Sequence, residues 1–161
     1  MSEPTVLVTG GAGFIGSHLI DTLLAEGHCV VCLDNFNDFY SPRRKRQHVE
    51  PHLDNANFTL VEADIRNRDT VLAVFEHHRP THVAHLAAMA NVRYSIERAA
   101  LYAEVNVQGT VNMLDGARAV GAENFLMAST SAIYGKAPVT PFTEELAVNE
   151  PLAPYPATIK A

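Results

Sequence analysis

The residues best suited to chemistry near the start of the chain form a glycine-rich turn. Gly11, Gly13 and Gly16 satisfy the pattern G-x-G-x-x-G, and Gly10 extends it to G-x-x-G-x-x-G. The turn follows a short apolar run and precedes a helical pattern. Such a turn lets the backbone approach a pyrophosphate, and the N–H groups of the following helix point at it. This context predicts a dinucleotide-binding turn and disfavours an unliganded glycine loop.

Two carboxylates follow the next two apolar runs. Asp34 stands about 20 residues after the turn, where a carboxylate accepts both hydroxyls of an adenosine ribose and repels a 2′-phosphate. It therefore favours NAD over NADP, the alternative being an aspartate that only serves the turn before Asn35. Asp64 follows the third apolar run and could accept a hydrogen bond from the adenine amino group.

Hydroxyl groups gather near the end of the chain. Thr130 follows the last apolar run, and Tyr155 precedes a final helical stretch. A hydroxyl and a tyrosine placed in this way can share one substrate oxygen. The tyrosine would exchange a proton while a nicotinamide exchanges a hydride.

The elements that must position these groups alternate along the chain. We expect strands over 5–9, 29–33, 58–62, 81–86 and 124–128, and helices over 14–26, 43–52, 69–78 and about 98–120. This alternation predicts an α/β fold with a doubly wound parallel sheet, in which ligands bind beyond the carboxyl ends of the strands. The apolar face of the first helix is expected to comprise Phe14, Ile15, Leu19, Leu23 and Leu24.

Composition narrows the classes of function. The 161 residues suit one domain, and the net charge of −6 argues against a general nucleic-acid binder. The sequence has no apolar stretch of the ~20 residues that span a bilayer and no signal-peptide pattern, so we expect a cytoplasmic protein without membrane partners.

Cys29 and Cys32 would point to opposite faces of one strand, which favours two buried thiols over a disulfide or metal pair. The histidines are scattered without ligand spacing, so we expect them mostly at the surface and expect no metal site.

A basic run covers residues 43–46. Four consecutive residues of a helix face all directions, so a solvated helix is the favoured interpretation. Because the run lies close to Asp34 in the sequence, a contact to the adenosine end of a cofactor is the alternative.

Motifs along nearly the whole chain resemble one known family. They are TGGAGFIGSHL, DNFND, ADIR at 63–66, HLAAMANVRYS, EVNVQG at 104–109 and STSAIYG. In this order they resemble the N-terminal half of an extended short-chain dehydrogenase/reductase of the NAD-dependent nucleotide-sugar epimerase/dehydratase type. DNFNDFYSPRRKR and NVRYS are similar to the UDP-glucuronate 4-epimerase branch in particular, with UDP-glucose 4-epimerases next.

The resemblance implies roles for individual residues. The catalytic Ser/Thr and tyrosine would be Thr130 and Tyr155, with Lys160 as the candidate lysine. Residues implied to surround the cofactor are Gly10, Gly13, Phe14, Ile15 and Gly16 at the pyrophosphate, Asp34 and Asn35 at the ribose, Asp64 and Ile65 at the adenine, and Leu86, Ala87, Ala88 and Ser129 along its length, with Asn106 as the structural asparagine of the active-site helix.

Two departures from the family stand out. The family motif is Y-x-x-x-K, but Ile159 holds the fourth position after Tyr155 and the lysine is Lys160. In the family this lysine holds the nicotinamide ribose, and on a helix positions i and i+4 share a face whereas i+5 does not. The family also continues for about as long again. We therefore expect residues 1–161 to be a cofactor-binding domain without the last strands and the substrate-binding part. An exposed edge at the fifth strand would favour association with another chain, such as a second copy of this one.

The implied activity is 4-epimerisation of a UDP-sugar by transient oxidation at C4 with bound NAD. A 4,6-dehydratase is disfavoured because that branch places Asp-Glu after the catalytic threonine, where this chain has Ser131 and Ala132. A simple reductase stays open. So does a remnant that binds NAD without efficient catalysis, which Ile159 favours.

Overall fold

The computed structural model describes residues 4–137, 140–147 and 150–161. The chain forms two compact units. One, here called the sheet unit, comprises the chain up to Ala87 together with Thr110–Ala128. The other, here called the helical unit, comprises Ala88–Gly109 and Ser129–Ala161. That residues 1–161 act as one cofactor-binding domain stays a prediction.

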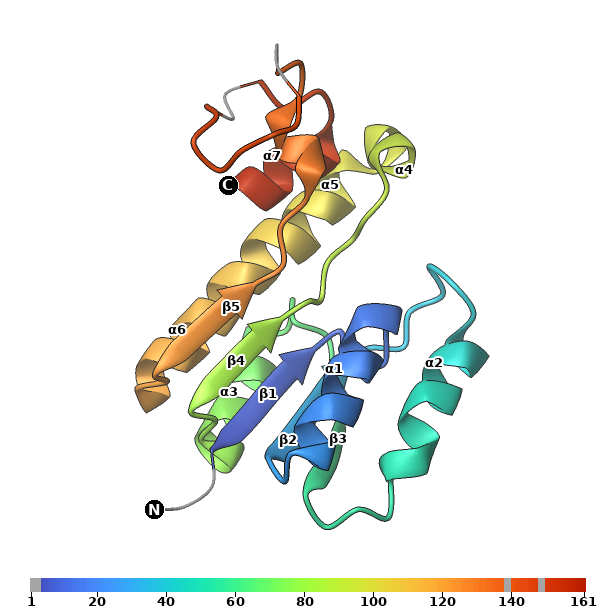
Figure 1. The fold of residues 1–161 in the computed structure, drawn as a ribbon, viewed down its shortest axis with the longest axis vertical. Helices are drawn as coiled ribbons and strands as arrows, with labels where there is room; N and C mark the ends of the chain where they lie inside the picture. The colour runs from blue at the N-terminus through green and yellow to red at the C-terminus, as the bar shows by residue number, and fades with distance from the viewer. Residues whose placement is uncertain (1–3, 138–139, 148–149) are drawn as a thin grey trace. The chain divides into compact units, whose positions relative to one another are not determined.

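The sheet unit is built on five parallel strands (Figure 1). They are β1 (Thr5–Thr9), β2 (Cys29–Asp34), β3 (Phe58–Glu62), β4 (His82–His85) and β5 (Asn124–Met127), in the spatial order β3-β2-β1-β4-β5. The chain builds outward from β1 to β3 and then returns to place β4 on the other side of β1. The doubly wound Rossmann-type sheet is therefore confirmed, with its switch point between β1 and β4.

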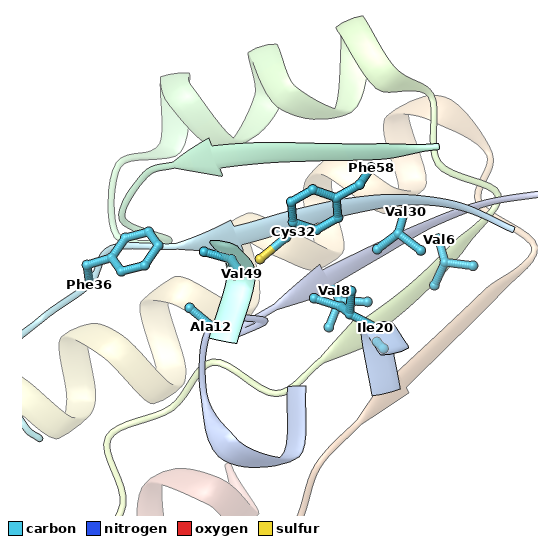
Figure 2. Close-up of a cluster of buried hydrophobic side chains, with 10 residues drawn as sticks. Val6, Val8, Ala12, Ile20, Val30, Cys32, Phe36, Val49 and Phe58 are labelled. Carbon is cyan, nitrogen blue, oxygen red and sulfur yellow. The ribbon is translucent and has the colours of Figure 1, made fainter. Parts of the chain in front are cut away.

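Helices cover the sheet on both faces. They are α1 (Phe14–Ala25), α2 (Pro42–Val49), α3 (Arg68–His78) and α6 (Thr110–Val120), and a short 3-10 turn, η1 (Glu50–His52), follows α2. On one face a cluster of buried apolar residues joins the strands to α1, α2 and the loops beside them (Figure 2). The members of this cluster are Val6, Val8, Ala12, Ile20, Val30, Cys32, Phe36, Val49, Phe58 and Ala84. On the other face α3 packs against α6. The helix expected over 43–52 ends earlier, before Pro51, which has no N–H to continue it.

The expected apolar face of α1 is wrong at its first turn. Phe14 and Ile15 are 70% and 68% exposed, whereas Ile20 is buried in the core. Phe14 and Ile15 lie in the first turn of α1, before the part of the helix that packs against the sheet.

The two cysteines differ in burial, although two buried thiols were expected. Both are free, but only Cys32 is buried and Cys29 is partly exposed.

The helical unit contains short elements. They are α4 (Val92–Glu97), α5 (Ala99–Tyr102), a π-helical segment η2 (Ala103–Gly109), a 3-10 turn η3 (Ser131–Tyr134) and α7 (Pro154–Lys160). The single helix expected over 98–120 is therefore wrong, because α5, η2 and α6 follow one another with different helical pitch. Widened π turns are rare and often occur at functional sites, and η2 contains Asn106.

Strand β5 lies at one edge of the described sheet. Its Leu126 side chain is 58% exposed. Association through this edge stays a prediction. None of the helices in the described part of the chain is long and apolar enough to cross a membrane.

Candidate functional site

The glycine turn is packed so closely that two of its positions exclude a side chain. Gly10 has φ +66°, and a Cβ there would lie 2.9 Å from the Ala87 nitrogen. A Cβ on Gly16 would overlap the carbonyl oxygen of Gly10 and lie 2.7 Å from the Gly11 Cα. The Gly10 N–H donates to the Leu33 carbonyl (2.8 Å), which ties the turn to the end of β2. The turn therefore sits between β1, β2 and the segment after β4, at the switch point of the sheet.

The first turn of α1 suits an anion. Gly13 is its N-cap and carries no side chain to occupy the helix N–H groups, and the first turn contains no acidic residue. The N–H groups and the helix dipole at such an end favour a phosphate. The Tyr40 hydroxyl meets the Phe14 N–H at this end, and the glycine turn around the helix terminus fits a dinucleotide pyrophosphate.

Asp34 is fixed at the carboxyl end of β2. Its side chain is only 5% exposed, and each oxygen accepts one backbone hydrogen bond. The Ala12 N–H donates to Oδ2 (3.2 Å) and the Phe36 N–H to Oδ1 (2.8 Å). Ala12 belongs to the glycine turn, so the carboxylate is held beside the turn that would bind the pyrophosphate.

Lys45 is the unexpected member of the site. Its Nζ lies 3.5 Å from Asp34 Oδ1, donates to Asn37 Oδ1 (2.9 Å), and stands 5.0 Å from the centre of the Tyr40 ring. The side chain is buried, whereas Arg43 and Arg44 of the same basic run are exposed. A solvated helix is therefore the wrong interpretation for Lys45, because a buried carboxylate and an amide oxygen replace water around its ammonium group.

Asp64, after β3, is held by a second set of donors. Asn35 Nδ2 donates to its Oδ2 (3.0 Å), and the Arg66 guanidinium donates to Oδ1 through Nε (3.0 Å) and to Oδ2 through the terminal nitrogen (2.8 Å). The hydrogen bonds from Arg66 lower the pKa of Asp64 to about 2, with a smaller contribution from Asn35. Asp64 is thus a carboxylate at neutral pH, and Arg66 already occupies part of its hydrogen-bonding capacity.

Asn112 on α6 supports this loop. Its buried Nδ2 donates to the carbonyl oxygens of Ile65 (2.9 Å) and Arg66 (3.2 Å). Sequence reasoning missed Asn112, since nothing in its neighbourhood marks a polar residue on a helix as buried. It fixes the backbone of Ile65 and Arg66, directly after Asp64.

A buried histidine joins β1 and β4 at the switch point. His85 Nδ1 lies 2.7 Å from Thr9 Oγ1, and its Nε2 lies 3.0 Å from Thr110 Oγ1. The Ala87 N–H donates to the same Thr9 oxygen (3.1 Å). Burial lowers the pKa of His85 to about 4, so the imidazole is neutral at pH 7. The expectation of surface histidines is wrong for His85.

In the helical unit, Asn106 joins two segments. Its Oδ1 accepts the Met89 N–H (2.7 Å), and its Nδ2 donates to the Met89 carbonyl (3.0 Å) and to Thr158 Oγ1 (3.0 Å). The Thr158 hydroxyl in turn donates to the carbonyl of Tyr155 (2.9 Å). Asn106 therefore ties the chain at Met89 to the helix that carries Tyr155.

The two candidate hydroxyls stand at element starts. Thr130 caps η3, where its Oγ1 accepts the Ala132 N–H (3.2 Å). Tyr155 lies in the first turn of α7 instead of before it, and its ring meets that of Tyr102 edge-on with centres 6.2 Å apart. Tyr102 is buried and donates its hydroxyl to the carbonyls of Ala90 and Asn91.

Ile159 and Lys160 take different faces of α7. Ile159, on the same face as Tyr155, is 8% exposed, whereas Lys160 is exposed at the last position of the helix. Five residues of an α-helix rotate a side chain to about 140° from the first one. The structure therefore does not bring Lys160 to the face of Tyr155.

The candidate residues divide between the two units. The helical unit holds Ala88, Asn106, Ser129, Thr130, Tyr155 and Lys160. The sheet unit holds Gly10, Gly13, Phe14, Ile15, Gly16, Asp34, Asn35, Asp64, Ile65, Leu86 and Ala87. Within the residues that the structure describes, no group of three or more His, Cys, Asp or Glu side chains could hold a metal ion.

The switch-point turn, the carboxylate after β2 and the parallel sheet define a Rossmann-type fold. Comparison with known proteins gives the family: the model for GDP-mannose 4,6 dehydratase matches residues 7–160, and the chain belongs to this family. The resemblance to nucleotide-sugar epimerases and dehydratases is thereby confirmed.

Individual relatives are 4-epimerases. The chain is 41% identical to a UDP-glucuronate 4-epimerase of Thermodesulfobacterium geofontis, over 96% of the chain and 47% of the relative. It is 40% identical to UDP-glucuronate 4-epimerase 4 of Arabidopsis thaliana, over 98% of the chain and 36% of the relative. The chain thus spans about half the length, or less, of these relatives.

Solved structures agree in fold. The Thermus thermophilus UDP-glucose 4-epimerase in complex with NAD is 41% identical with a TM-score of 0.82, over 96% of this chain and 47% of that one. The Bacillus cereus UDP-glucuronic acid 4-epimerase, in complex with UDP-glucuronic acid and NAD, is 32% identical with a TM-score of 0.88, over 97% of this chain and 49% of that one.

Proposed function

We propose that this chain is the NAD-binding part of a nucleotide-sugar 4-epimerase acting on a UDP-sugar of the UDP-glucuronate or UDP-glucose type. The observation that carries the proposal is the glycine turn held between Ala87 and the buried carboxylate of Asp34. A Cβ at Gly10 or Gly16 would collide with backbone atoms of the turn or of the segment after β4, so glycine at both positions keeps the turn compact beside the N-terminus of α1. Similarity to 4-epimerases crystallised with NAD supports the same reading.

The residues of the sheet unit would hold the cofactor in order along its length. Gly10, Gly13 and Gly16, with the N–H groups of Phe14 and Ile15, take the pyrophosphate. Asp34 and Asn35 take the ribose, Asp64 and Ile65 the adenine, and Leu86 and Ala87 the segment beyond.

The residues of the helical unit would handle the proton. When bound, NAD supplies an acceptor for the hydride of the sugar C4 and returns it. The Tyr155 hydroxyl takes the proton of the sugar hydroxyl and gives it back. The Thr130 Oγ1 accepts a hydrogen bond from the Ala132 N–H. A hydroxyl can accept and donate at the same time, so Thr130 would donate its hydrogen to the same sugar oxygen. The family resemblance implies that Ala88 and Ser129 would also contact the cofactor.

A second candidate function is cofactor binding without efficient turnover. The buried Ile159 on the Tyr155 face favours it, because an apolar side chain there supplies no charge to stabilise a tyrosinate. In this reading the sheet unit keeps its ligand while proton transfer is slow.

Titration of the chain with NAD and NADP by calorimetry, together with the melting temperature, tests the proposal. Because a ligand that binds only the folded state stabilises it by mass action, saturable NAD binding should raise the melting temperature. A cooperative melt with no response to either dinucleotide contradicts the proposal.

One pair of substitutions tests which face of α7 the cofactor would meet, and a turnover assay separates the two candidate functions. Ile159→Lys should tighten NAD binding if position 159 faces the nicotinamide ribose, whereas Lys160→Met, the matched control, should leave it unchanged. Conversion of UDP-glucuronate by the unmodified chain excludes the second candidate. The opposite pattern, with Lys160→Met weakening NAD binding, would restore Lys160 to the site.

A further inference from the structure

We infer that Lys45 sets the selectivity of the ribose end of the site by cancelling the charge of Asp34, so that this chain tolerates NADP better than an aspartate at this position ordinarily allows. The inference rests on the proposed binding of a nicotinamide dinucleotide. It concerns a residue to which the proposed function assigns no role, and it gives a specific form to the contact at the adenosine end that the basic run left open.

The ammonium group of Lys45 is held in one place. It lies 3.5 Å from Asp34 Oδ1 and donates to Asn37 Oδ1 at 2.9 Å. Asn37 is itself fixed, because its N–H donates to Asn35 Oδ1 (3.1 Å) and its Oδ1 also accepts the Phe39 N–H (3.3 Å). With the side chain of Lys45 buried to the same extent as that of Asp34, water screens the pair weakly.

The two carboxylate oxygens of Asp34 differ in how much hydrogen-bond acceptor capacity remains for a ligand. Oδ1 accepts the Phe36 N–H and faces Lys45, whereas Oδ2 accepts the Ala12 N–H. A carboxylate oxygen has about two acceptor positions, so Oδ2 keeps one for a ribose hydroxyl. Asp34 can therefore still recognise the ribose of NAD while its charge is balanced.

Rejection of a 2′-phosphate by an aspartate depends on that charge. A lone carboxylate repels the phosphate, but a carboxylate and an ammonium at similar distances from it have opposing Coulomb energies of similar size. Other cations of the basic run do not substitute for Lys45: Arg43 and Arg44 are exposed, and Arg46 is paired with Glu62 at 2.8 Å. The balance at Asp34 therefore depends on Lys45.

Lys45→Met tests this directly, because methionine fills much of the same space without the charge. Calorimetry with NAD and with NADP should show that the substitution weakens NADP binding at least tenfold more than NAD binding. Arg44→Met is the matched control, since it removes the same charge from an exposed position of α2. Its NAD to NADP affinity ratio should change by less than twofold.

Removing one partner of a buried ion pair can unfold a protein, so a second variant is needed. Asp34→Asn combined with Lys45→Met leaves the site neutral, and its affinity ratio should stay within threefold of that of the unmodified chain. If Asp34 alone set the selectivity, this double variant would shift at least tenfold toward NADP, and that result overturns the inference. An unchanged ratio in a folded Lys45→Met variant that binds NAD also overturns it. Absence of NAD binding to the unmodified chain instead refutes the proposed function, which separates the two failures.

Discussion

Thr9 on β1 and His85 on β4 are joined by a hydrogen bond of 2.7 Å at the switch point of the sheet. The two residues are direct partners in the parallel register. The Ala87 N–H also donates to Thr9 Oγ1, and the second ring nitrogen of His85, Nε2, lies 3.0 Å from Thr110 Oγ1. The neutral imidazole thus connects β1, β4 and α6 beneath the segment that meets Gly10.

This buried imidazole predicts a pH dependence of stability. The pKa of His85 is about 4 in the folded protein, whereas an unperturbed histidine, as in the unfolded chain, has a pKa of 6.5. The unfolded chain therefore takes up this proton at a higher pH than the folded one. The contribution of His85 to the free energy of unfolding is therefore fully present above pH 6.5 and is lost as the pH falls toward 4. At ~1.36 kcal/mol per pH unit, this loss amounts to at most about 3 kcal/mol. Urea unfolding between pH 7.5 and 4 should show this slope, and His85→Asn should flatten it. An equal slope in both proteins would assign the effect to other groups. Asp64, with its pKa lowered to about 2, acts only at still lower pH.

The glycine turn predicts a contrast between two alanine substitutions. Gly10 and Gly27 both have positive φ, but only Gly10 would bring a Cβ against backbone atoms, while nothing lies within 4 Å of one at Gly27. Gly27→Ala should therefore cost about 1 kcal/mol of unfolding free energy, from the backbone conformation alone. Gly10→Ala should cost about 2–4 kcal/mol, because overpacking adds to the same conformational cost. Chemical denaturation measures both, and equal losses would mean that the contact with Ala87 is not as close as described.

Asn91 predicts a stabilising substitution. It has φ +79°, which non-glycine residues rarely adopt, and its side chain accepts the N–H groups of Arg93 and Tyr94 at the start of α4. Asn91→Gly should raise stability by about 0.5–1 kcal/mol, since the strain of about 1–3 kcal/mol exceeds the small loss of capping. Asn91→Ala is the control and should be destabilising, because it loses the cap and keeps the strain. Thermal melts of the three proteins give the order, and a Gly variant below the parent contradicts it.

Asn112 predicts a link between α6 and the adenine end of the site. Asn112→Ala leaves the Ile65 carbonyl without its side-chain donor and should cost about 1–3 kcal/mol. The same variant should bind NAD more weakly, because the loop of Asp64 and Ile65 loses its support. Asn124→Ala, at an exposed position of β5, should leave both measurements unchanged. Normal NAD affinity in a destabilised Asn112→Ala would separate this loop from the ligand.

Local patterns predicted the parts of the molecule that depend on periodicity and turn chemistry. The strands, the glycine turn and the position of Asp34 follow from alternation of elements and from a motif whose spacing is set by backbone geometry. The π-helical turn around Asn106 could not be predicted, because the apolar positions continue across it with helical spacing. Polar residues that become buried were missed for a different reason. Lys45, His85 and Asn112 are buried because partners far apart in the sequence satisfy them, and no local pattern encodes those partners.

Roles at the candidate site depend on the same distinction. Motifs in the sequence marked Asp34 and Tyr155 as candidates. Lys45, the cation beside Asp34, could be recognised only from the structure, because the position of α2 brings the two side chains together. Lys160 was a candidate because of its sequence distance from Tyr155, and the regular pitch of α7 is what separates the two.

The packing of Cys32 beneath the glycine turn gives the chain an internal measure of local opening. Its sulfur is so close to Gly11 that a Cβ there would lie 2.6 Å away, and burial raises the pKa of the thiol to about 12. Thiol reagents react with the thiolate, so Cys32 should not react until the glycine turn moves away from the sheet. The partly exposed Cys29 should therefore be modified first. The rate of the second modification therefore counts opening events at the turn itself. A dinucleotide seated there should slow that rate without changing the first.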